Sequence, residues 1–397
     1  MERVRVAVVG AGQAGLAVSY ELRERGLEHV VLERGRIGQT WRGRWDSFCL
    51  VTPNWSVQLP GGSYDGPDPD GYMPRDEIVR YLERYAEAAP VRQEVDVERA
   101  GPRNGGFLLR TSQGELHANA IVVASGTYRK PHLPVAAGTL PPELQVLTAD
   151  AYRSPDALAD GAVLVIGSGQ SGCQIAEELH ESGREVVLSC GRAPWLPRRP
   201  GGQDLVWWVH ESGFLDRTVD TLPAPEARLS ANVLATGRDG GHDLHLRVLR
   251  DRGVTLTGRF LGADGGLVHF ADDLGESIAW GDESYRQLAA LFEDLARERG
   301  LEAPLDEPPP FDATSPKSLE LRRFGAVVFT AGFRPDYASW LPAQAFDPLG
   351  FPLHRDGAST VVPGLFFVGV HFLRKRKSSL LIGVGEDAAL VARAIGA

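Results

Sequence analysis

The chain has 397 residues, a formal net charge of -10 at pH 7 and a hydrophobic fraction of 43%. This length allows two or three domains with sizeable cores, and the negative charge argues against a general nucleic-acid-binding role. No apolar stretch approaches the roughly 18 residues that a membrane span needs, so we expect no membrane association.

The cysteines and the N-terminus indicate where the protein works. Cys49, Cys173 and Cys190 show no CxxC spacing, which suggests a reducing compartment. A strand pattern begins at once, with no signal-peptide pattern before it, so we expect a cytoplasmic protein. The histidines show no ligand spacing with cysteines or carboxylates, and we predict no metal site.

The first motif in chain order is a glycine-rich turn after an apolar strand pattern. Gly10, Gly12 and Gly15 frame Gln13 and Ala14. A buried strand, a tight glycine turn and a helix start let backbone N–H groups approach a pyrophosphate, whose charge the helix N-terminus favours. We therefore expect these five residues to bind a dinucleotide.

Glu33 indicates which dinucleotide this turn binds. It follows the next predicted strand, residues 30–32. An acid about twenty residues beyond such glycines hydrogen-bonds a ribose 2′-OH and repels a 2′-phosphate. We therefore expect the adenosine half of FAD or NAD here, and not that of NADP. The alternative interpretation of Glu33 is a solvated acid at a strand end.

Two later strands end alike. Residues 120–124 lead into Ser125 and Gly126, and residues 326–330 lead towards Gly332; a proline-containing connector follows each strand. We interpret the connectors as two crossings between domains, and we expect the three named residues to border a cofactor. The predicted units are 1–149 and 332–397, which together form an FAD-binding domain, and 150–331, an inserted NADPH-binding domain.

A second glycine-rich turn of the same kind follows the apolar run 162–166. One such turn is a weak signal, but two in the right strand and helix context predict two dinucleotides. The fold expected is therefore α/β, with two Rossmann-like domains that bind FAD and NADPH. The residues expected to bind at the second turn are Gly167, Ser168, Gly169, Gln170, Ser171 and Gly172.

The strand after the second turn ends without an acid. Its last residues lead into Ser189 and Arg192, with Arg198 and Arg199 farther along. Arginine donates two parallel hydrogen bonds to a phosphate, so we expect Ser189 and Arg192 to bind a 2′-phosphate and to favour NADPH over NADH. The alternative is that these arginines lie on a solvated loop.

Two later segments are candidates for function. Residues 201–240 have weak periodicity and form either a lid over the substrate or a packed helical insert. Gly383 and Gly385 open the last helix, and we expect a third N-terminus that favours anions there. The basic run 374–377 lies before it, as an entrance for anions or as a solvated loop.

This arrangement resembles the class B flavin-dependent monooxygenases, including the bacterial CzcO-like flavoproteins. The resemblance spans nearly the whole chain and rests on both glycine turns, on Thr40 and Trp41, and on residues 331–335 and 383–387. It implies that NADPH reduces FAD, that O2 adds at flavin C4a, and that the hydroperoxide waits for a substrate. It also places Thr40 and Trp41 at the FAD.

Two positions refine the resemblance. The family fingerprint carries a histidine four residues before an aromatic residue; here Thr148 replaces the histidine and Tyr152 matches the heteroatom-oxidising variety. A Baeyer–Villiger reaction is therefore less expected. Asn54 resembles a flavin-edge asparagine that hydrogen-bonds the hydroperoxide, and we predict it as the catalytic residue. The alternative for Asn54 is a turn asparagine bonded to its own backbone.

The leading hypothesis is an NADPH-dependent FAD monooxygenase that oxygenates a small molecule at nitrogen or sulfur through a C4a-hydroperoxyflavin, with O2 as co-substrate. A second hypothesis is a flavin reductase or dehydrogenase without oxygen insertion. Its disulfide branch needs a redox cysteine beside the flavin, and Cys49 is the candidate. A third is a flavin-based redox sensor. The sequence is compatible with a homodimer.

Overall fold

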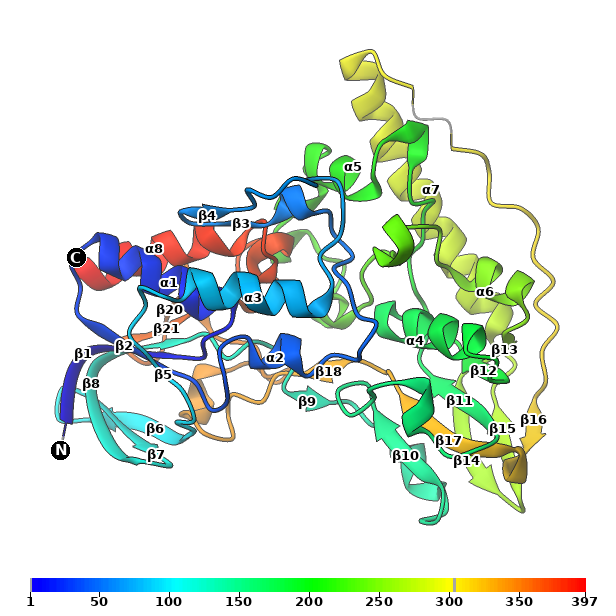
Figure 1. The fold of residues 1–397 in the computed structure, drawn as a ribbon, viewed down its shortest axis with the longest axis horizontal. Coiled ribbons are helices and arrows are strands. Elements are labelled where there is room, and N and C mark those ends of the chain that lie inside the picture. Colours follow the sequence, from blue (N-terminus) through cyan, green and yellow to red (C-terminus); the bar gives the residue numbers. More distant parts are fainter. Residues whose placement is uncertain (1, 303–304) are drawn as a thin grey trace.

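A computed structural model describes residues 2–302 and 305–397. Two α/β units lie side by side, with both chain termini in the same unit (Figure 1). The first unit is built on a nine-stranded sheet to which both ends of the chain contribute, in the order β19-β20-β21-β8-β1-β2-β5, with β7 paired to β8 and β6 to β7. The strands of this sheet are β1 (Glu2–Val9), β2 (His29–Leu32), β5 (Val91–Arg92), β6 (Val97–Arg103), β7 (Gly106–Thr111), β8 (Gly114–Val123), β19 (His354–Arg355), β20 (Ala358–Ser359) and β21 (Leu365–Phe367).

The second unit is built on a five-stranded parallel sheet in the order β10-β17-β11-β12-β13. Its strands are β10 (Gln145–Thr148), β11 (Ala162–Ile166), β12 (Val186–Ser189), β13 (Thr255–Thr257) and β17 (Phe324–Phe329). Because β10 belongs to this sheet, the second unit begins before the boundary expected at residue 150. An antiparallel sheet of β14 (Phe260–Asp264), β15 (Leu267–Phe270) and β16 (Ser318–Glu320) lies beside it.

The two predicted crossings pair with each other. The connectors form β9 (Lys130–Pro131) and β18 (Phe333–Arg334), which are antiparallel, with Phe333 opposite Pro131 (Figure 1). The chain therefore leaves the first unit and returns to it at one place. This pairing places the ends of β8 and β17, and the residues that follow them, beside the junction of the two units.

Strand side chains alternate between the two faces of a sheet. Apolar residues therefore lie on both faces and are covered by other elements. Val6 and Val8 of β1 pack under helices of the first unit, while Ala7 and Val9 face a second core on the other side. The first unit contains α1 (Gln13–Glu24), α2 (Gln39–Arg42), α3 (Arg75–Tyr85), α8 (Val384–Gly396) and a small hairpin of β3 (Gln58–Leu59) and β4 (Gly62–Ser63); the second contains α4 (Gln170–Glu181), α5 (Leu205–Glu211), α6 (Leu246–Arg252) and α7 (Leu274–Arg299).

Parallel register brings the functional ends of the strands together. Val9 at the end of β1 lies opposite Leu32 of β2 and Val123 of β8. In the second sheet, Ile166 at the end of β11 lies opposite Ser189 of β12 and Phe329 of β17. Ligands of open α/β sheets bind outside these carboxyl ends. Each unit thus presents a glycine turn flanked by two strand ends.

Candidate functional site

The first glycine turn has the geometry of a pyrophosphate cradle. Gly10 has a φ of +108°, and a Cβ there would approach the carbonyl oxygen of Ala124 to 2.7 Å. A Cβ at Gly15 would overlap the carbonyl oxygen of Gly10, whereas a Cβ at Gly12 would meet nothing within 4 Å. Gly12 is also the N-cap of α1, and no side chain caps this helix. Open space therefore lies in front of free N–H groups, which suits an anion.

Glu33 lies beside this turn. Its carboxylate accepts hydrogen bonds from the backbone N–H of Ala11 at 2.7 Å and of Gly35 at 3.0 Å, and it is 7% exposed. The interpretation as a solvated acid is therefore wrong. The carboxylate fixes the turn, and its oxygens keep lone pairs for further hydrogen bonds at the edge of the cavity.

The second glycine turn repeats this geometry. Gly167 has a φ of +110°, and a Cβ at Gly172 would overlap the carbonyl oxygen of Gly167. A Cβ at Gly169 would meet only the Ala231 side chain, at 3.6 Å. Gly169 is the N-cap of α4, again without a side-chain cap. The Ser168 hydroxyl bonds the backbone of Gly191 at 3.0 Å and fastens the turn to the residue after β12.

The end of β12 corrects part of the phosphate-site prediction. The Ser189 hydroxyl is buried; it donates to the Gly258 carbonyl at 3.0 Å and accepts from the Phe260 N–H at 2.8 Å, so it is not free for a phosphate. Arg198 is paired with Asp204, and the guanidinium of Arg199 donates to backbone carbonyls. Arg192 alone of these residues is exposed at the cavity.

Both turns open into one cavity of about 690 Å³ between the two units. Most of the residues predicted to bind cofactors line it. These are Gly10, Gly12, Gln13, Ala14, Glu33, Thr40, Trp41, Ser125, Gly126, Gly167, Ser168, Gly169, Gln170, Ser171, Arg192 and Gly332. Gly15 and Gly172 lie behind their turns, where they allow each helix to approach its strand.

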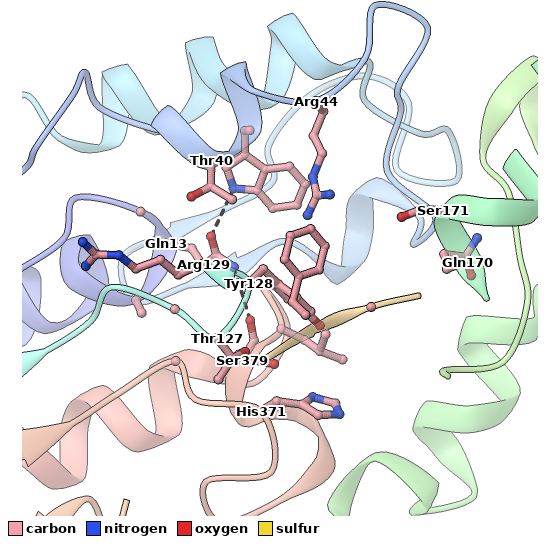
Figure 2. A pocket seen from close by; sticks show the side chains of 18 of the residues that line it. Gln13, Thr40, Arg44, Thr127, Tyr128, Arg129, Gln170, Ser171, His371 and Ser379 are labelled. Carbon is pink, nitrogen blue, oxygen red and sulfur yellow. Dashed lines mark hydrogen bonds between the residues drawn. The ribbon is translucent and has the colours of Figure 1, made fainter. Parts of the chain in front are cut away.

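Gln13 connects three segments at the first turn, as Figure 2 shows. Its amide oxygen accepts from the Trp41 indole N–H at 3.1 Å, and its amide nitrogen donates to the Ser379 carbonyl at 3.2 Å. Trp41 in turn packs against Phe48, with ring centroids 5.9 Å apart. The N-terminus of α1, the α2 segment and the chain before α8 are therefore held together around the cavity.

Besides Gly15, Gly172 and Ser189, three more predicted site residues do not line the cavity: Asn54, Gly383 and Gly385. Both ends of the Asn54 amide bond to backbone, its nitrogen to the Asp68 carbonyl at 2.9 Å and its oxygen to the Met73 N–H at 2.8 Å. The Asn54 amide therefore joins its own segment to the loop of residues 68–73, and it is neither free for the flavin edge nor bonded within its own turn. A Cβ at Gly383 would overlap Lys377, and one at Gly385 would approach Pro60 to 3.0 Å. These glycines allow close packing, so the expectation of an anion site at them is corrected.

The last helix has its own charge partners. Glu386 pairs with Lys375 at 2.9 Å and with Lys377 at 2.6 Å. Asp387 is 2% exposed and pairs with Arg374 at 2.9 Å. Acids in the first turn of a helix stabilise its dipole, and here both acids also pair with side-chain cations. The basic run is therefore neither a free entrance nor a solvated loop.

The segment expected to be a lid or an insert has a packed helical part and a part that lines the cavity. Its α5 packs into the core of the second unit, where Trp208 stacks on Phe292 at 5.5 Å. Farther along, residues 228–232 line the cavity and dock onto the first unit. Arg228 donates to the Phe372 carbonyl at 3.0 Å and lies 3.9 Å from the Phe351 ring centroid. We call residues 213–232 the strap.

The fingerprint residues are structural in this chain. Tyr152 is fully buried and donates from its hydroxyl to Glu178 at 2.8 Å. The carbonyl of Thr148 accepts from the N–H groups of Ala151 and Tyr152, which turns the chain after β10. Neither residue lines the cavity between the units.

Sequence patterns missed several polar residues around the cavity. Besides Oγ of the predicted Ser125, the buried atoms without a hydrogen-bond partner include four from residues that were not predicted: Nε of Arg44, Oγ1 of Thr127, Nδ1 of His371 and Oγ of Ser379. Burial first, and then Arg376 and Arg228, lower the pKa of His371 to about 4. His371 is therefore neutral at neutral pH. No local motif marks these residues, because they come from loops that meet only in the folded chain.

The cysteines do not form a redox centre. Cys49, Cys173 and Cys190 are free and buried, and none lines the cavity. Burial raises the pKa of Cys49 to about 11 and that of Cys190 to about 12, so both stay protonated and unreactive at neutral pH. In the part of the chain that the structure describes, no group of three or more potential ligands could hold a metal ion. No described helix is long and apolar enough to cross a membrane.

Comparisons with known proteins agree with this architecture. A family model of pyridine nucleotide-disulphide oxidoreductases matches residues 7–210. An uncharacterized CzcO-like oxidoreductase of Geobacillus kaustophilus is 30% identical over 97% of this chain and 96% of its own length. Flavin-containing monooxygenase 1 of Oryctolagus cuniculus is 29% identical over 56% of this chain and 46% of its own length. A flavin-containing monooxygenase structure from Stenotrophomonas maltophilia has a TM-score of 0.70 and 22% identity, covering 100% of this chain and 99% of that one.

Proposed function

Because the chain belongs to the class B flavin-dependent monooxygenases within the pyridine nucleotide-disulphide oxidoreductase family, we propose that it is an FAD- and NADPH-dependent monooxygenase of small molecules. The observation that carries this proposal is the shared cavity. Two dinucleotide turns of equal geometry open into one space, so a pyridine ring and an isoalloxazine can meet there.

The first turn fits FAD. The open space at Gly12, the uncapped N-terminus of α1 and the carboxylate of Glu33 suit a pyrophosphate and a ribose without a 2′-phosphate. The buried hydroxyls of Ser125 and Thr127 have no partner and face the same cavity. Hydroxyls of this kind bind polar atoms of a cofactor, because a buried polar group without a partner is costly.

The second turn fits NADPH. Gly169 leaves space in front of the uncapped N-terminus of α4, and no carboxylate stands at the end of β12. Arg192 is exposed at the cavity and would bind the 2′-phosphate through its planar guanidinium. When bound, the two cofactors supply hydride transfer and the activation of O2 that delivers one oxygen atom to the substrate.

The residues of the chain orient the cofactors and the substrate and exclude water from the cavity. Leu380, Leu381 and Ile382 line the cavity from the first unit, and residues 228–232 of the strap line it across both units. We propose nitrogen or sulfur oxygenation. A lone pair on either atom can accept an oxygen atom without a base that removes a proton from the substrate. The neutral state of His371 is compatible with such a reaction.

A disulfide reductase is the second candidate, because the matching family model is named for that activity. Such an enzyme needs thiols that exchange electrons with the flavin. The three cysteines of this chain lie away from the cavity, and burial raises their pKa values. This arrangement favours oxygen insertion over thiol exchange.

One experiment separates these functions. The FAD-loaded protein is reduced without oxygen by NADPH or by NADH, and isotopically labelled O2 is then admitted with amines and sulfides. We expect faster reduction by NADPH and one labelled oxygen atom per product molecule. Hydrogen peroxide equal to the NADPH consumed, with every substrate, would overturn the monooxygenase. A gain of titratable thiols on reduction would instead support the disulfide reductase.

A further inference from the structure

Arg44 is a cationic side chain that reaches into the cavity without an anion to pair with. It follows α2 in the first unit, and its guanidinium points into the space between the two units, towards Tyr128 and across from His371 (Figure 2). Nε is shielded from solvent and has no hydrogen-bond partner. Within residues 2–302 and 305–397, no carboxylate forms an ion pair with it; neighbouring Asp46 pairs with Arg75 at 2.7 Å.

An arginine without a partner lowers the stability of the fold unless a ligand pairs with its charge. Burial lowers the pKa of Arg44, and Tyr128 and Asp150 offset this only in part. Arg44 is half-buried, and a charge withdrawn from water in this way needs a partner and hydrogen bonds to recover the hydration that it lost. Stability is given up in this way mostly where function needs the group. The missing partner is therefore an anion that enters the cavity.

The surroundings of Arg44 indicate what kind of anion enters. The guanidinium carbon lies 5.8 Å from the Phe48 ring centroid, and Tyr128 packs edge-on against Phe333 at 5.6 Å. These rings line the cavity and offer an apolar surface beside the cation. The pyrophosphates already have a glycine turn and a helix N-terminus each. A planar guanidinium beside aromatic rings suits a carboxylate on an apolar body.

We propose that Arg44 binds the carboxylate of an aromatic or similarly apolar organic acid, which makes organic anions the substrate class of this enzyme. This inference rests on the monooxygenase function proposed above, because that function makes the cavity a substrate site. Oxygenation occurs elsewhere on the molecule, and Arg44 fixes the orientation. It is a binding residue and takes no part in bond making.

The first test measures binding without turnover. Phenylacetate and its neutral counterpart phenylacetamide, with a panel of other carboxylate and amide pairs, are titrated into the oxidised FAD-loaded protein by calorimetry. We expect the acid to bind roughly tenfold or more tightly than the amide, which is the usual strength of a charge-assisted pair. Arg44→Gln removes this preference, and Arg44→Lys keeps part of it. Arg110→Gln, at an exposed position of β7, is the matched control and changes nothing.

The outcomes separate two sources of the anion. NADP⁺ affinity is expected to stay the same in all variants. Weaker NADP⁺ binding by Arg44→Gln would assign the residue to a coenzyme phosphate and overturn the proposal. Equal affinity for acid and amide, or no binding of any carboxylate at millimolar concentration, would also overturn it. Because no oxygen is consumed, these results hold whether or not the protein inserts oxygen.

A second test compares unfolding temperatures, first without and then with a ligand. Arg44→Met keeps the length of the side chain and its contact with Phe48 but removes the unpaired charge. We expect the FAD-loaded variant to unfold at the same temperature or at one about 1–3 °C higher. Added phenylacetate raises the unfolding temperature of the parent protein and not that of the variant. A lower unfolding temperature for the variant without ligand would show that Arg44 has a structural partner, and would contradict the proposal.

Discussion

The two glycine turns have the same backbone and different neighbours. Gly10 and Gly167 have φ values of +108° and +110°, and the third glycine of each turn sits against the carbonyl of the first. The first turn is fixed by the Glu33 carboxylate on the Ala11 N–H, and the second by the Ser168 hydroxyl on Gly191. The glycines therefore give both turns the same backbone, while the side chains that fix each turn differ; in our proposal the residues after the next strand select the nucleotide.

The turns also differ in what lies over them. The residues after β8 lie against the first turn, and Thr330, after β17, bonds the Gly167 carbonyl at 2.6 Å. The second turn has a further neighbour, because Ala231 of the strap lies opposite Gly169. The strap also bonds the first unit through Arg228 and Phe372, so the second turn, proposed for NADPH, has a neighbour that is held by both units.

The largest effect is expected from a methyl group added behind each turn. Gly15→Ala and Gly172→Ala would each drive a Cβ into a carbonyl oxygen of the same turn. We expect Gly15→Ala to lose FAD affinity by roughly a hundredfold or more, and Gly172→Ala to keep FAD but lose NADPH affinity to a similar extent. The flavin absorbance of the purified protein and its reduction by NADPH measure the two effects.

Circular dichroism must show a folded protein in both variants for this result to count. If Gly172→Ala lost FAD while Gly15→Ala kept it, the assignment of the two turns would be reversed. If both variants bound both cofactors normally, the glycines would not define the sites.

A methyl group in front of each turn distinguishes an effect on cofactor binding from an effect on folding. A Cβ at Gly12 meets nothing within 4 Å, and one at Gly169 makes only an ordinary contact. We therefore expect Gly12→Ala and Gly169→Ala to unfold at temperatures close to that of the parent protein. Their affinities for FAD and NADPH, respectively, should fall roughly tenfold, because the methyl group occupies the space of a phosphate. Unchanged affinity in a stable variant would place the pyrophosphates elsewhere.

The features that could be predicted from the sequence are those formed by residues close together in the chain. A strand, a glycine turn and a helix are adjacent in the chain, so the sheets, both turns and Glu33 were predictable from spacing. Ser189 was not, since its hydroxyl faces inward to Gly258, and a strand pattern does not show which neighbour meets a side chain. Arg44 and His371 were missed because they come from distant loops. Asn54 illustrates that residue type and position do not tell whether an amide is already bonded.

Arg192, which follows β12, tests whether the second turn distinguishes NADPH from NADH. Arg192→Ala should raise the KM for NADPH roughly tenfold to a hundredfold and leave the KM for NADH within about twofold, because only the 2′-phosphate loses its charged partner. Steady-state kinetics with both coenzymes measure this ratio. Arg199→Ala is the control, since its guanidinium bonds the carbonyls of Gly240 and Gly241. An equal loss with NADH would mean that Arg192 supports the fold of the site.

The smallest predicted effect concerns the strap. Asp216 pairs with Lys375 at 2.7 Å and with Lys377 at 3.1 Å, and its side chain is 41% exposed. Burial opposes ionisation of Asp216, but hydrogen bonds from the two lysines outweigh it and hold the pKa below its ordinary value. The stabilisation is therefore complete above the unfolded pKa of about 3.9 and is lost as pH falls through the lower folded value.

Asp216→Asn should therefore lower the free energy of unfolding by about 1 kcal/mol or less at pH 7, because solvent screens so exposed a pair. At pH values below both pKa values the variant and the parent protein should be equally stable, as denaturant unfolding at each pH would show. A loosened strap should raise the KM for NADPH about twofold and leave FAD binding unchanged, since Ala231 lies at the second turn only. An equal effect on both cofactors would mean that the strap holds the whole cavity, and that the two turns do not differ in their dependence on it.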